Sequence, residues 1–338
     1  MRKKLEIMKR FLIIAFIAFS FKGIAQQQEQ YSLYMMNNFL VNPAEGGTEE
    51  FIDLKLGYRT QWVGLEGAPQ TGFISGHGAV GKKTSRFEEV KQLPYHGVGG
   101  IVQTDQIGVW NTLDVKASYS YHLPVSEKLI ISFGTFIGVK QLKYDAASAE
   151  FEYDPSSGQG VNNDAAFANQ GTRYAPDATL GIWAYSDNYY IGVSSFQLFG
   201  NTMSFEEYQT GNTDVTPQDA QAKLARHYWF TGGYRFGVGE HHHIIPSFVM
   251  KVVDAAPPQF DINAKFRYED KYWLGASYRN LDAIVLLAGI TIKKIFDIGY
   301  AYDANISNLN SYNTGSHEIM IGLRLPNHKH EPAPAQFW

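Results

Sequence analysis

The sequence predicts an all-β protein: a transmembrane antiparallel β-barrel of about 14 strands, with both termini in the periplasm. Three observations predict this fold class. The chain starts with an export signal, it then contains many segments of about ten residues in which apolar and polar side chains alternate, and it has 32 Gly, 21 Tyr and 22 Phe but no Cys. No apolar window after the signal is long enough for a transmembrane helix. A secreted β-sandwich or propeller is the alternative, but it predicts shorter strands and a blade-like repeat, and neither is visible.

The first 25 residues read as a secretory signal peptide. A basic start is followed by an apolar run at residues 11–21 and by small residues up to Ala25, ahead of Gln26. A membrane anchor is the alternative, but the run is much shorter than the roughly 20 residues that a helix needs to cross a bilayer. We therefore predict cleavage near Ala25 and delivery of the remaining chain to the bacterial outer membrane, in contact with its lipid.

Cleavage changes the charge of the protein. Removing residues 1–25 takes away six of the 29 basic residues and one of the 33 acidic residues, which leaves 23 and 32 and a formal charge near −9. An acidic chain is a poor partner for nucleic acid, because phosphate binding needs clustered Lys and Arg. Without Cys the exported chain has no disulfides and no thiolate metal site. A closed sheet, which has no free edges, is another source of stability.

Residues 51–60 show the alternation most simply. One face of this segment is apolar, with Ile52, Leu54, Leu56 and Tyr58, and the other carries Asp53, Lys55, Gly57 and Arg59. The same pattern recurs at residues 113–121, 260–268, 296–303 and 318–325. Lengths of about nine to eleven residues suit a tilted transmembrane strand better than the average soluble strand of five or six.

Roughly fourteen segments of this kind follow one another, and an even number is what a single-chain bacterial barrel requires. Their predicted starts lie near Phe51, Gln70, Tyr95, Trp110, Leu129, Ala175, Asn188, Arg226, His243, Gln259, Lys271, Ala283, Ile295 and Gly315.

The lengths of the connections set the predicted orientation. If the first strand runs outward, the long polar connections at residues 145–174 and 200–225 lie outside the cell, and the short turns at residues 187–188, 269–270 and 293–294 lie in the periplasm. Long external loops and short periplasmic turns are the usual asymmetry of such barrels. The connection at residues 81–94 is an exception, because it is long on the periplasmic side.

We divide the chain into a signal peptide at residues 1–25, an N-terminal periplasmic or lumenal segment at 26–50, a transmembrane β-barrel at 51–325 and a C-terminal tail at 326–338. The N-terminal segment is rich in aromatic residues and Met and ends in a turn at residues 42–44. It is apolar enough to need burial, so we expect it inside the lumen or against a periplasmic partner.

The predicted lumenal faces carry charges of both signs, such as Asp114 with Lys116 and Glu318 with Arg324. Charges of both signs tend to pair across strands, which indicates a filled or narrow interior more than a wide pore of one sign. The inward glycines are expected to let the strands bend in a closed sheet. They are Gly99, Gly134, Gly138, Gly181, Gly275 and Gly322.

No catalytic residue, cofactor or metal site is predicted. The only histidine cluster, His241-His242-His243, reads as a turn, since consecutive residues of an extended chain point to opposite faces and cannot converge on a metal. No nucleophile elbow, phosphate loop or acidic calcium loop is present. An outer-membrane hydrolase built on Ser, His and Asn remains an alternative, because the sequence alone does not place any His beside a Ser.

Two stretches resemble the PorP/SprF family of type IX secretion system outer-membrane proteins. The first has the family form Q-Y-x-x-N-x-x-x-x-N-P-A-x-x-G, and the second the hairpin form Y-R-x-Q-W-x-G-x-x-G-x-P-x-T. The matching residues in the first are Gln30, Tyr34, Asn37 or Asn38, Asn42, Pro43, Ala44 and Gly47. Those in the second are Tyr58, Arg59, Gln61, Trp62, Gly64, Gly67, Pro69 and Thr71. Met35-Met36 and the proline-spaced tail depart from the family pattern.

The resemblance implies a non-enzymatic barrel that works with the type IX export machinery. The implied partners are a secreted protein with a C-terminal sorting domain, such as an adhesin of gliding motility, and the lipoproteins of the machine. We expect the long polar loops or the N-terminal segment to recognise the partner. A passive, porin-like solute channel is the alternative function, and a transporter of a small apolar ligand is a third, because one barrel can serve all three.

Overall fold

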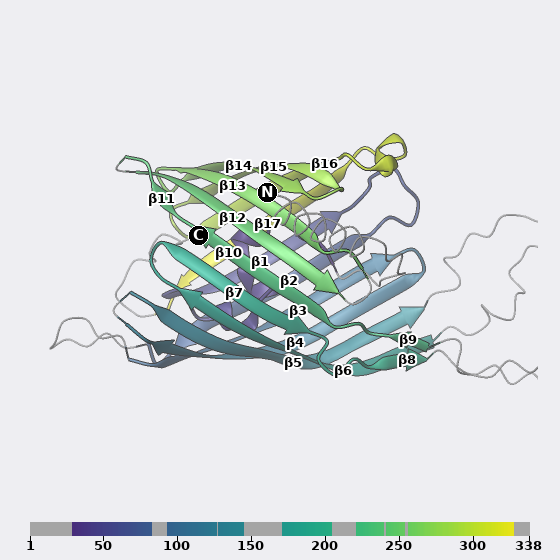
Figure 1. Ribbon diagram of the computed structural model, residues 1–338, viewed down its shortest axis with the longest axis horizontal. Helices are drawn as coiled ribbons and strands as arrows, with labels where there is room; N and C mark the ends of the chain where they lie inside the picture. The colour runs from purple at the N-terminus through teal and green to yellow at the C-terminus, as the bar shows by residue number, and fades with distance from the viewer. Residues whose placement is uncertain are drawn as a thin grey trace, which may run out of the picture.

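The computed structural model describes residues 29–82, 93–126, 128–144, 171–204, 221–239, 241–253 and 256–327. In these residues, 14 antiparallel strands form a closed barrel (Figure 1). This confirms the predicted all-β barrel of about 14 strands and rules out the sandwich and the propeller, whereas the placement of both termini in the periplasm stays a prediction. The predicted signal peptide, most of the two long loops and of the connection at residues 81–94, and the tail beyond Asn327 lie outside the described residues.

The strands follow one another around the barrel in chain order. They are β1 Phe51–Thr60, β2 Gln70–Val80, β3 Tyr95–Ile107, β4 Trp110–Pro124, β5 Ile130–Tyr144, β6 Gly171–Tyr185, β7 Tyr189–Phe196, β10 His227–Tyr234 with its continuation β11 Phe236–Gly237, β12 His242–Val253, β13 Gln259–Tyr268, β14 Tyr272–Arg279, β15 Ala283–Ile292, β16 Phe296–Asn305 and β17 Ser316–Pro326. A separate two-stranded hairpin, β8 Thr202–Ser204 with β9 Gln221–Lys223, lies between β7 and β10.

Pairing of the first and last strands closes the sheet. β1 pairs with β17 from Phe51 opposite Pro326 to Thr60 opposite His317, and β10 joins β7 to β12 on the other side of the barrel. Phe51 and Pro326 therefore lie at one end, which we call the proximal end. We call the other end, which carries the turn between β1 and β2, the distal end. That the proximal end faces the periplasm stays a prediction.

The predicted strand starts agree with the structure to within one residue, except at β6. This strand begins at Gly171, four residues before the predicted start at Ala175. Its first four residues pair with the distal end of β5, where Gly171 lies opposite Tyr144, but none of their side chains is buried. A strand that is open to solvent on both faces has no need to alternate, so its sequence carries no signal.

The outward face of the barrel is apolar and exposed. Ile74, Ile137, Leu274 and Leu286 each leave between 58% and 64% of their surface uncovered. A band of exposed apolar side chains around a closed sheet is what a lipid-facing barrel presents. Separately, none of the helices in the described residues is long and apolar enough to span a membrane.

Candidate functional site in the barrel lumen

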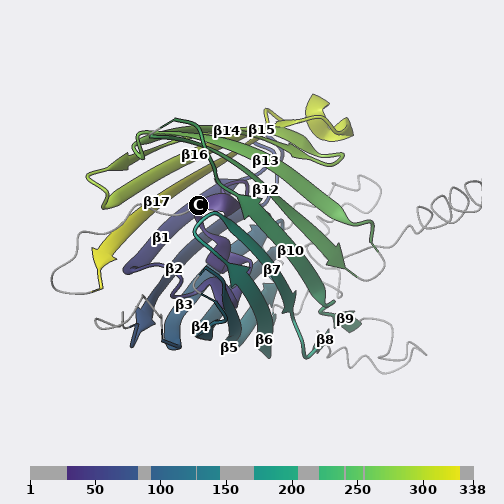
Figure 2. The ribbon, with the colours of Figure 1, turned by 60° about the vertical axis from the view of Figure 1, so that its left-hand side comes forward.

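The lumen is filled by residues 29–49, which we call the plug. The plug forms three short 3-10 turns, η1 Tyr34–Met36, η2 Asn38–Leu40 and η3 Pro43–Glu45. Leu33, Phe39 and Ala44 in it are completely buried. Figure 2 shows it in purple inside the ring of strands. Of the two sequence-based alternatives for this segment, burial in the lumen is therefore the one that the structure adopts.

The plug runs from the distal end of the lumen to the proximal end. Near the distal end, Gln30 Nε2 donates to Oε1 of Gln259, the first residue of β13, at 3.1 Å. Near the proximal end, the Gly47 amide donates to His77 Nδ1 at 3.1 Å, and β1 then begins at Phe51. The first described residues thus lie at the opposite end of the barrel from Pro326.

A buried cluster around Ser32, which we call the Ser32 latch, ties the distal part of the plug to four strands. Ser32 Oγ lies 2.8 Å from both carboxylate oxygens of Asp303, 2.8 Å from Arg59 Nη1 and 2.9 Å from Arg279 Nη2. The Ser32 amide donates to Glu318 Oε2 at 2.6 Å, and the Leu33 amide to Oε1 at 3.2 Å. Hydrogen bonds to charged groups contribute about 1.5–3 kcal/mol each, so the latch is a strong attachment.

A second attachment, which we call the Gly46 clamp, holds the proximal part of the plug. The Gly46 carbonyl accepts hydrogen bonds from Ser120 Oγ and from His122 Nε2, the latter at 2.8 Å. His122 Nδ1 lies 3.1 Å from the Tyr185 hydroxyl. Because a carbonyl can only accept, Nε2 carries the proton and does not act as a base toward Ser120. This Ser and His pair, 3.1 Å apart, therefore holds backbone instead of resembling the nucleophile and base of a hydrolase.

The predicted Asn42-Pro43-Ala44 turn lies between the two attachments. Asn42 Oδ1 accepts from the Ala44 amide at 3.0 Å and caps η3, which begins at Pro43. Asn42 Nδ2 donates to the carbonyls of Ile182 and Val193, at 3.0 and 3.2 Å. The turn therefore fixes the plug to the backbones of β6 and β7 through one side chain.

Glycines in the barrel wall make room for this turn. A Cβ on Gly181 would lie 2.0 Å from Asn42 Oδ1, and one on Gly134 would lie 2.3 Å from the Ala44 amide nitrogen. Real Cβ atoms do not approach other atoms this closely. We expected these inward glycines to let the strands bend. At Gly134 and Gly181 the structure shows another reason: the plug backbone takes the place of a side chain.

The hairpin motif is divided between three environments. Arg59 and Thr71 face the lumen, where Thr71 Oγ1 donates to Asp105 Oδ1 at 2.6 Å. Tyr58 faces outward, and its hydroxyl donates to Gln70 Oε1 at 2.8 Å. The remaining motif residues build the distal turn between β1 and β2 and are Gln61, Trp62, Gly64, Gly67 and Pro69. Of the hairpin motif, only Arg59 joins the Ser32 latch.

Several residues of the two attachments were not among the predicted site residues. Arg279 and Glu318 carried a signal as inward charges on predicted strands, but only the register of the sheet shows that they meet. Ser32 has no distinctive sequence context, whereas Ser120 and His122 lie in the short run Ser118-Tyr119-Ser120-Tyr121-His122, which resembles the family pattern. The three consecutive histidines do not form a site, since His242 and His243 begin β12 on alternate faces. The described residues contain no group of three His, Asp or Glu that could hold a metal ion.

Several lumenal charges are paired, as the mixed signs predicted. Ion pairs join Lys116 to Asp177 at 2.8 Å, Lys140 to Asp114 at 3.2 Å, Arg279 to Asp261 at 2.9 Å and Arg324 to Asp297 at 2.5 Å. Each of these pairs comes from two different strands, so it links the wall of the barrel.

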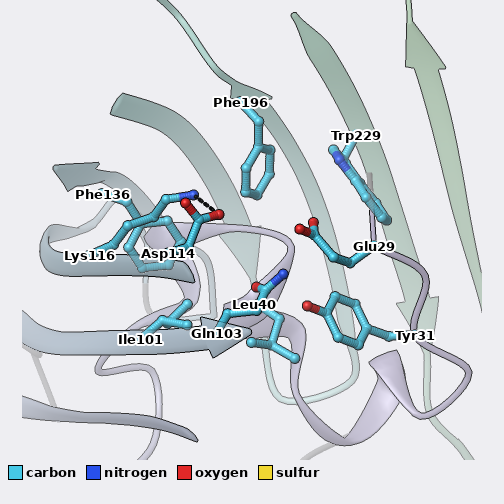
Figure 3. Close-up of a pocket in the computed structure, with 10 residues that line it drawn as sticks. All are labelled: Glu29, Tyr31, Leu40, Ile101, Gln103, Asp114, Lys116, Phe136, Phe196 and Trp229. Carbon is cyan, nitrogen blue, oxygen red and sulfur yellow. Dashed lines mark hydrogen bonds and ion pairs between the residues drawn. The ribbon is translucent and has the colours of Figure 1, made fainter. Parts of the chain in front are cut away.

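Little free space remains beside the plug. Figure 3 shows a cavity between Glu29 and Tyr31 of the plug and Lys116 and Asp114 of the wall. Its volume is about 20 Å³, and a neighbouring cavity that also borders Tyr31 and Trp229 measures about 30 Å³. Each holds one or two water molecules. The described lumen is therefore filled, in agreement with the interpretation of its charges.

A closed, lipid-facing barrel with a filled lumen defines an outer-membrane β-barrel protein. Residues 23–323 match the family described as "Type IX secretion system membrane protein PorP/SprF". The match covers most of the chain, so the protein belongs to this family. The predicted resemblance is confirmed, and the family is one of secretion components, not a known family of enzymes.

The chain also has a low similarity to several solved structures. The outer membrane protein Omp33 of Acinetobacter baumannii is 10% identical to this chain, with a TM-score of 0.42; the match covers 82% of this chain and 100% of Omp33. A FadL homologue of Pseudomonas aeruginosa is 9% identical to this chain, with a TM-score of 0.49; the match covers 85% of this chain and 93% of the homologue. The CymD monoaromatic hydrocarbon channel is 11% identical, with a TM-score of 0.47; the match covers 91% of this chain and 96% of CymD. No protein of curated function matches this chain.

Proposed function

We propose that this barrel assists the type IX secretion system in exporting secreted proteins or in attaching them to the cell surface. Its partners are a secreted protein with a C-terminal sorting domain, such as a gliding adhesin, and the lipoproteins of the machinery. Membership of the PorP/SprF family supports the link to this machinery. The barrel acts as a docking protein and carries out no catalysis.

The filled lumen is the observation that carries this proposal. A passive channel of porin type needs a continuous, water-filled path. Here the plug is tied down by the Ser32 latch and the Gly46 clamp, and the adjoining cavities hold only one or two waters each. A barrel of this kind offers its ends to other proteins more readily than its lumen to solutes.

The remaining predictions become part of the proposal. Residues 1–25 are removed near Ala25, the proximal end faces the periplasm, and residues 326–338 form a tail there. The long connections at residues 145–174 and 200–225 leave the distal end, because β5 and β7 both run toward it. This arrangement directs polar loops outward, toward a partner on the cell surface.

The first experiment is mild detergent extraction of the tagged protein from native outer membranes, followed by mass spectrometry of the proteins that elute with it. A large secreted multidomain protein or machinery lipoproteins at near-equal amounts are expected. Deletion of the barrel is expected to lower the amount of that protein at the surface. A barrel that purifies alone and conducts ions steadily after reconstitution contradicts the proposal and supports a solute channel.

A further inference from the structure

Four neighbouring connections at the distal end form one continuous structure, which we call the distal rim. It consists of residues 61–69, 108–109, 280–282 and 306–315, and the last of these includes η7 Asn308–Ser311. Figure 1 shows η7 projecting beyond the ends of the strands. The rim thus lies above β14 to β17 and β1 to β4.

Backbone hydrogen bonds between the connections join the rim. The Ile306 amide donates to the Asp282 carbonyl at 2.8 Å, the Thr314 amide to the Val63 carbonyl at 2.9 Å, and the Gly108 amide to the Gly67 carbonyl at 2.9 Å. Each bond connects two separate turns. A surface built in this way is ordered before a partner arrives, so binding costs less conformational entropy than with free loops.

The rim exposes large apolar side chains. Leu281 is 72% exposed and Tyr312 is 71% exposed, which makes them the two most exposed large apolar residues of the described chain. Ile306 and Leu65 of the same rim are also exposed. Apolar groups at the lipid-facing wall have the bilayer as their solvent, but these four lie on connections beyond the strands. Apolar clusters on such projecting surfaces mark sites of protein interaction.

Backbone strain accompanies this exposure. Leu281 has a φ of 59° and Trp62 a φ of 45°, in the left-handed region that bulky residues rarely adopt. Such a conformation costs roughly 1–2 kcal/mol, and Gly or Asn would avoid most of this cost. At Leu281 the cost is not offset by burial, since the side chain is exposed. Turns at the other end of the barrel share this geometry, for example at Glu269 and Lys293, so the exposure of Leu281 and not its φ distinguishes the rim.

The charge of the rim indicates the chemistry of its partner. Its four segments contain no Lys or Arg and two carboxylates, of which Glu66 is exposed and Asp282 is half-buried and paired with Arg279 Nη1 at 3.5 Å. The nearest basic residues on the adjoining strands, Arg59 and Arg279, are buried in the Ser32 latch. An apolar surface that carries an exposed carboxylate and no exposed Lys or Arg is complementary to an apolar surface bordered by Lys or Arg. It disfavours an anionic lipid surface.

We propose that the distal rim is a docking surface for a folded domain of the protein whose export or attachment the barrel assists. The domain presents an apolar face bordered by Lys or Arg. Leu281 and Tyr312 provide the apolar contact, and Glu66 pairs with its basic border. This inference rests on the proposed function. It adds to that function the surface at which the partner binds, which is the distal rim and not the two long loops, and the chemistry of the partner's binding face.

The test uses the full barrel in native outer membranes. A photo-crosslinking amino acid is placed at Tyr312 and, as a control, at Val125, which lies on a proximal turn and is 56% exposed. The expected result is a crosslink to one secreted protein from Tyr312 and none from Val125. Mapped peptides of that protein are expected to contain apolar residues next to Lys or Arg. Crosslinks only to lipid, or equal crosslinks from both positions, overturn the proposal.

Substitutions then test the chemistry. The pair Leu281→Asn and Tyr312→Ser removes the apolar contact, and Asn suits the left-handed backbone at position 281, so the barrel is expected to fold. Partner binding is expected to fall about tenfold or more. Glu66→Gln removes the exposed carboxylate and is expected to weaken binding as well and to reduce its sensitivity to salt. The control Val125→Asn is expected to change nothing.

The rim proposal and the proposed function fail in different ways. If deletion of the barrel lowers surface display but the rim variants bind their partner normally, the rim proposal is wrong and the proposed function stands. If deletion of the whole barrel leaves export and display unchanged, the proposed function itself is wrong. Heat-modifiable migration on gels confirms in each case that the variant is a folded barrel.

Discussion

At the scale of single residues, Ser32 of the plug forms hydrogen bonds to four charged residues of the barrel wall. Its hydroxyl and amide contact Arg59, Arg279, Asp303 and Glu318, which come from β1, β14, β16 and β17. These four charged groups also pair with one another, for example Arg59 with Asp303 at 2.8 Å. Ser32 therefore fastens the plug to a charge cluster that belongs to the wall.

Ser32→Ala is expected to loosen the distal part of the plug and leave the barrel intact. The change removes the hydroxyl from three buried charged groups, at a cost of about 1–3 kcal/mol. Hydrogen exchange of the plug amides is the measurement, and faster exchange is expected around residues 29–36. Ser118→Ala is a matched control, because Ser118 also faces the lumen and its side chain forms none of the described hydrogen bonds. Equal exchange in both variants contradicts the latch.

Gly181→Ala is expected to displace the Asn42-Pro43-Ala44 turn. The added Cβ would lie 2.0 Å from Asn42 Oδ1, so the turn has to move and its bonds to β6 and β7 are lost. Proteolysis of the plug in detergent should become faster. Gly237→Ala is the control, since no atom lies within 4 Å of its added Cβ. If the plug of the Gly181→Ala variant resists proteolysis as well as the wild-type plug does, the barrel wall can move to accommodate the added Cβ, and the prediction is wrong.

Glu49 is expected to make the stability of the protein dependent on pH. Burial and then the charge of Asp53 raise the pKa of this carboxyl to about 7, against the opposing cations Arg324, Lys82 and Lys55. A raised pKa means that the folded protein holds the proton more tightly than the unfolded chain. Stability is therefore highest below about pH 4.5 and falls as the pH rises through 7, by up to roughly 3 kcal/mol.

Denaturant unfolding of the wild type and of Glu49→Gln between pH 5 and pH 8 measures this effect. The Gln variant cannot ionise, so this contribution to the pH dependence should disappear, and above pH 7 the variant should be more stable than the wild type. The exposed Glu66→Gln serves as a control. A parallel pH dependence in all three proteins contradicts the assignment to Glu49.

At the scale of elements, the plug decides whether the barrel conducts. The wall is a complete sheet without it, because every barrel strand has two neighbours. Deletion of residues 31–47 is therefore expected to leave a folded barrel and to open a path lined by charged residues. Single-channel recording in planar bilayers should show steady conductance for the deletion and little for the wild type. Equal conductance in both would support the porin-like alternative.

Sequence patterns predicted the strands well and the plug only in part. Ile52, Leu54 and Leu56 alternate with lumenal residues, and alternation reports directly on a sheet with one lipid-facing side. The need of the N-terminal segment for burial was also visible in its composition. Its path was not, because the contacts of Asn42 with Ile182 and Val193 span 140 and 151 residues of chain. No local pattern records such a contact.

At the scale of the whole molecule, the outward face is expected to require lipid. Leu286 lies in the middle of β15 with 58% of its surface exposed, and Leu286→Arg places a charge in the bilayer at a cost of about 2–4 kcal/mol. Leu281→Arg, at an even more exposed position of the distal rim, should cost little stability. Unfolding in lipid vesicles compares the two variants. Equal, small effects would mean that β15 does not face the hydrocarbon.

The sequence by itself determined the fold class, the strand number and nearly all strand starts, because the two faces of each strand meet different solvents and side chains must alternate to match them. It also determined the family, through motifs that are local in the chain. Only the tertiary structure decided that the N-terminal segment fills the lumen, that Ser32 and Gly46 hold it there, and that four distal turns join into one rim. These features depend on register and barrel closure, which bring together residues that are far apart in the chain.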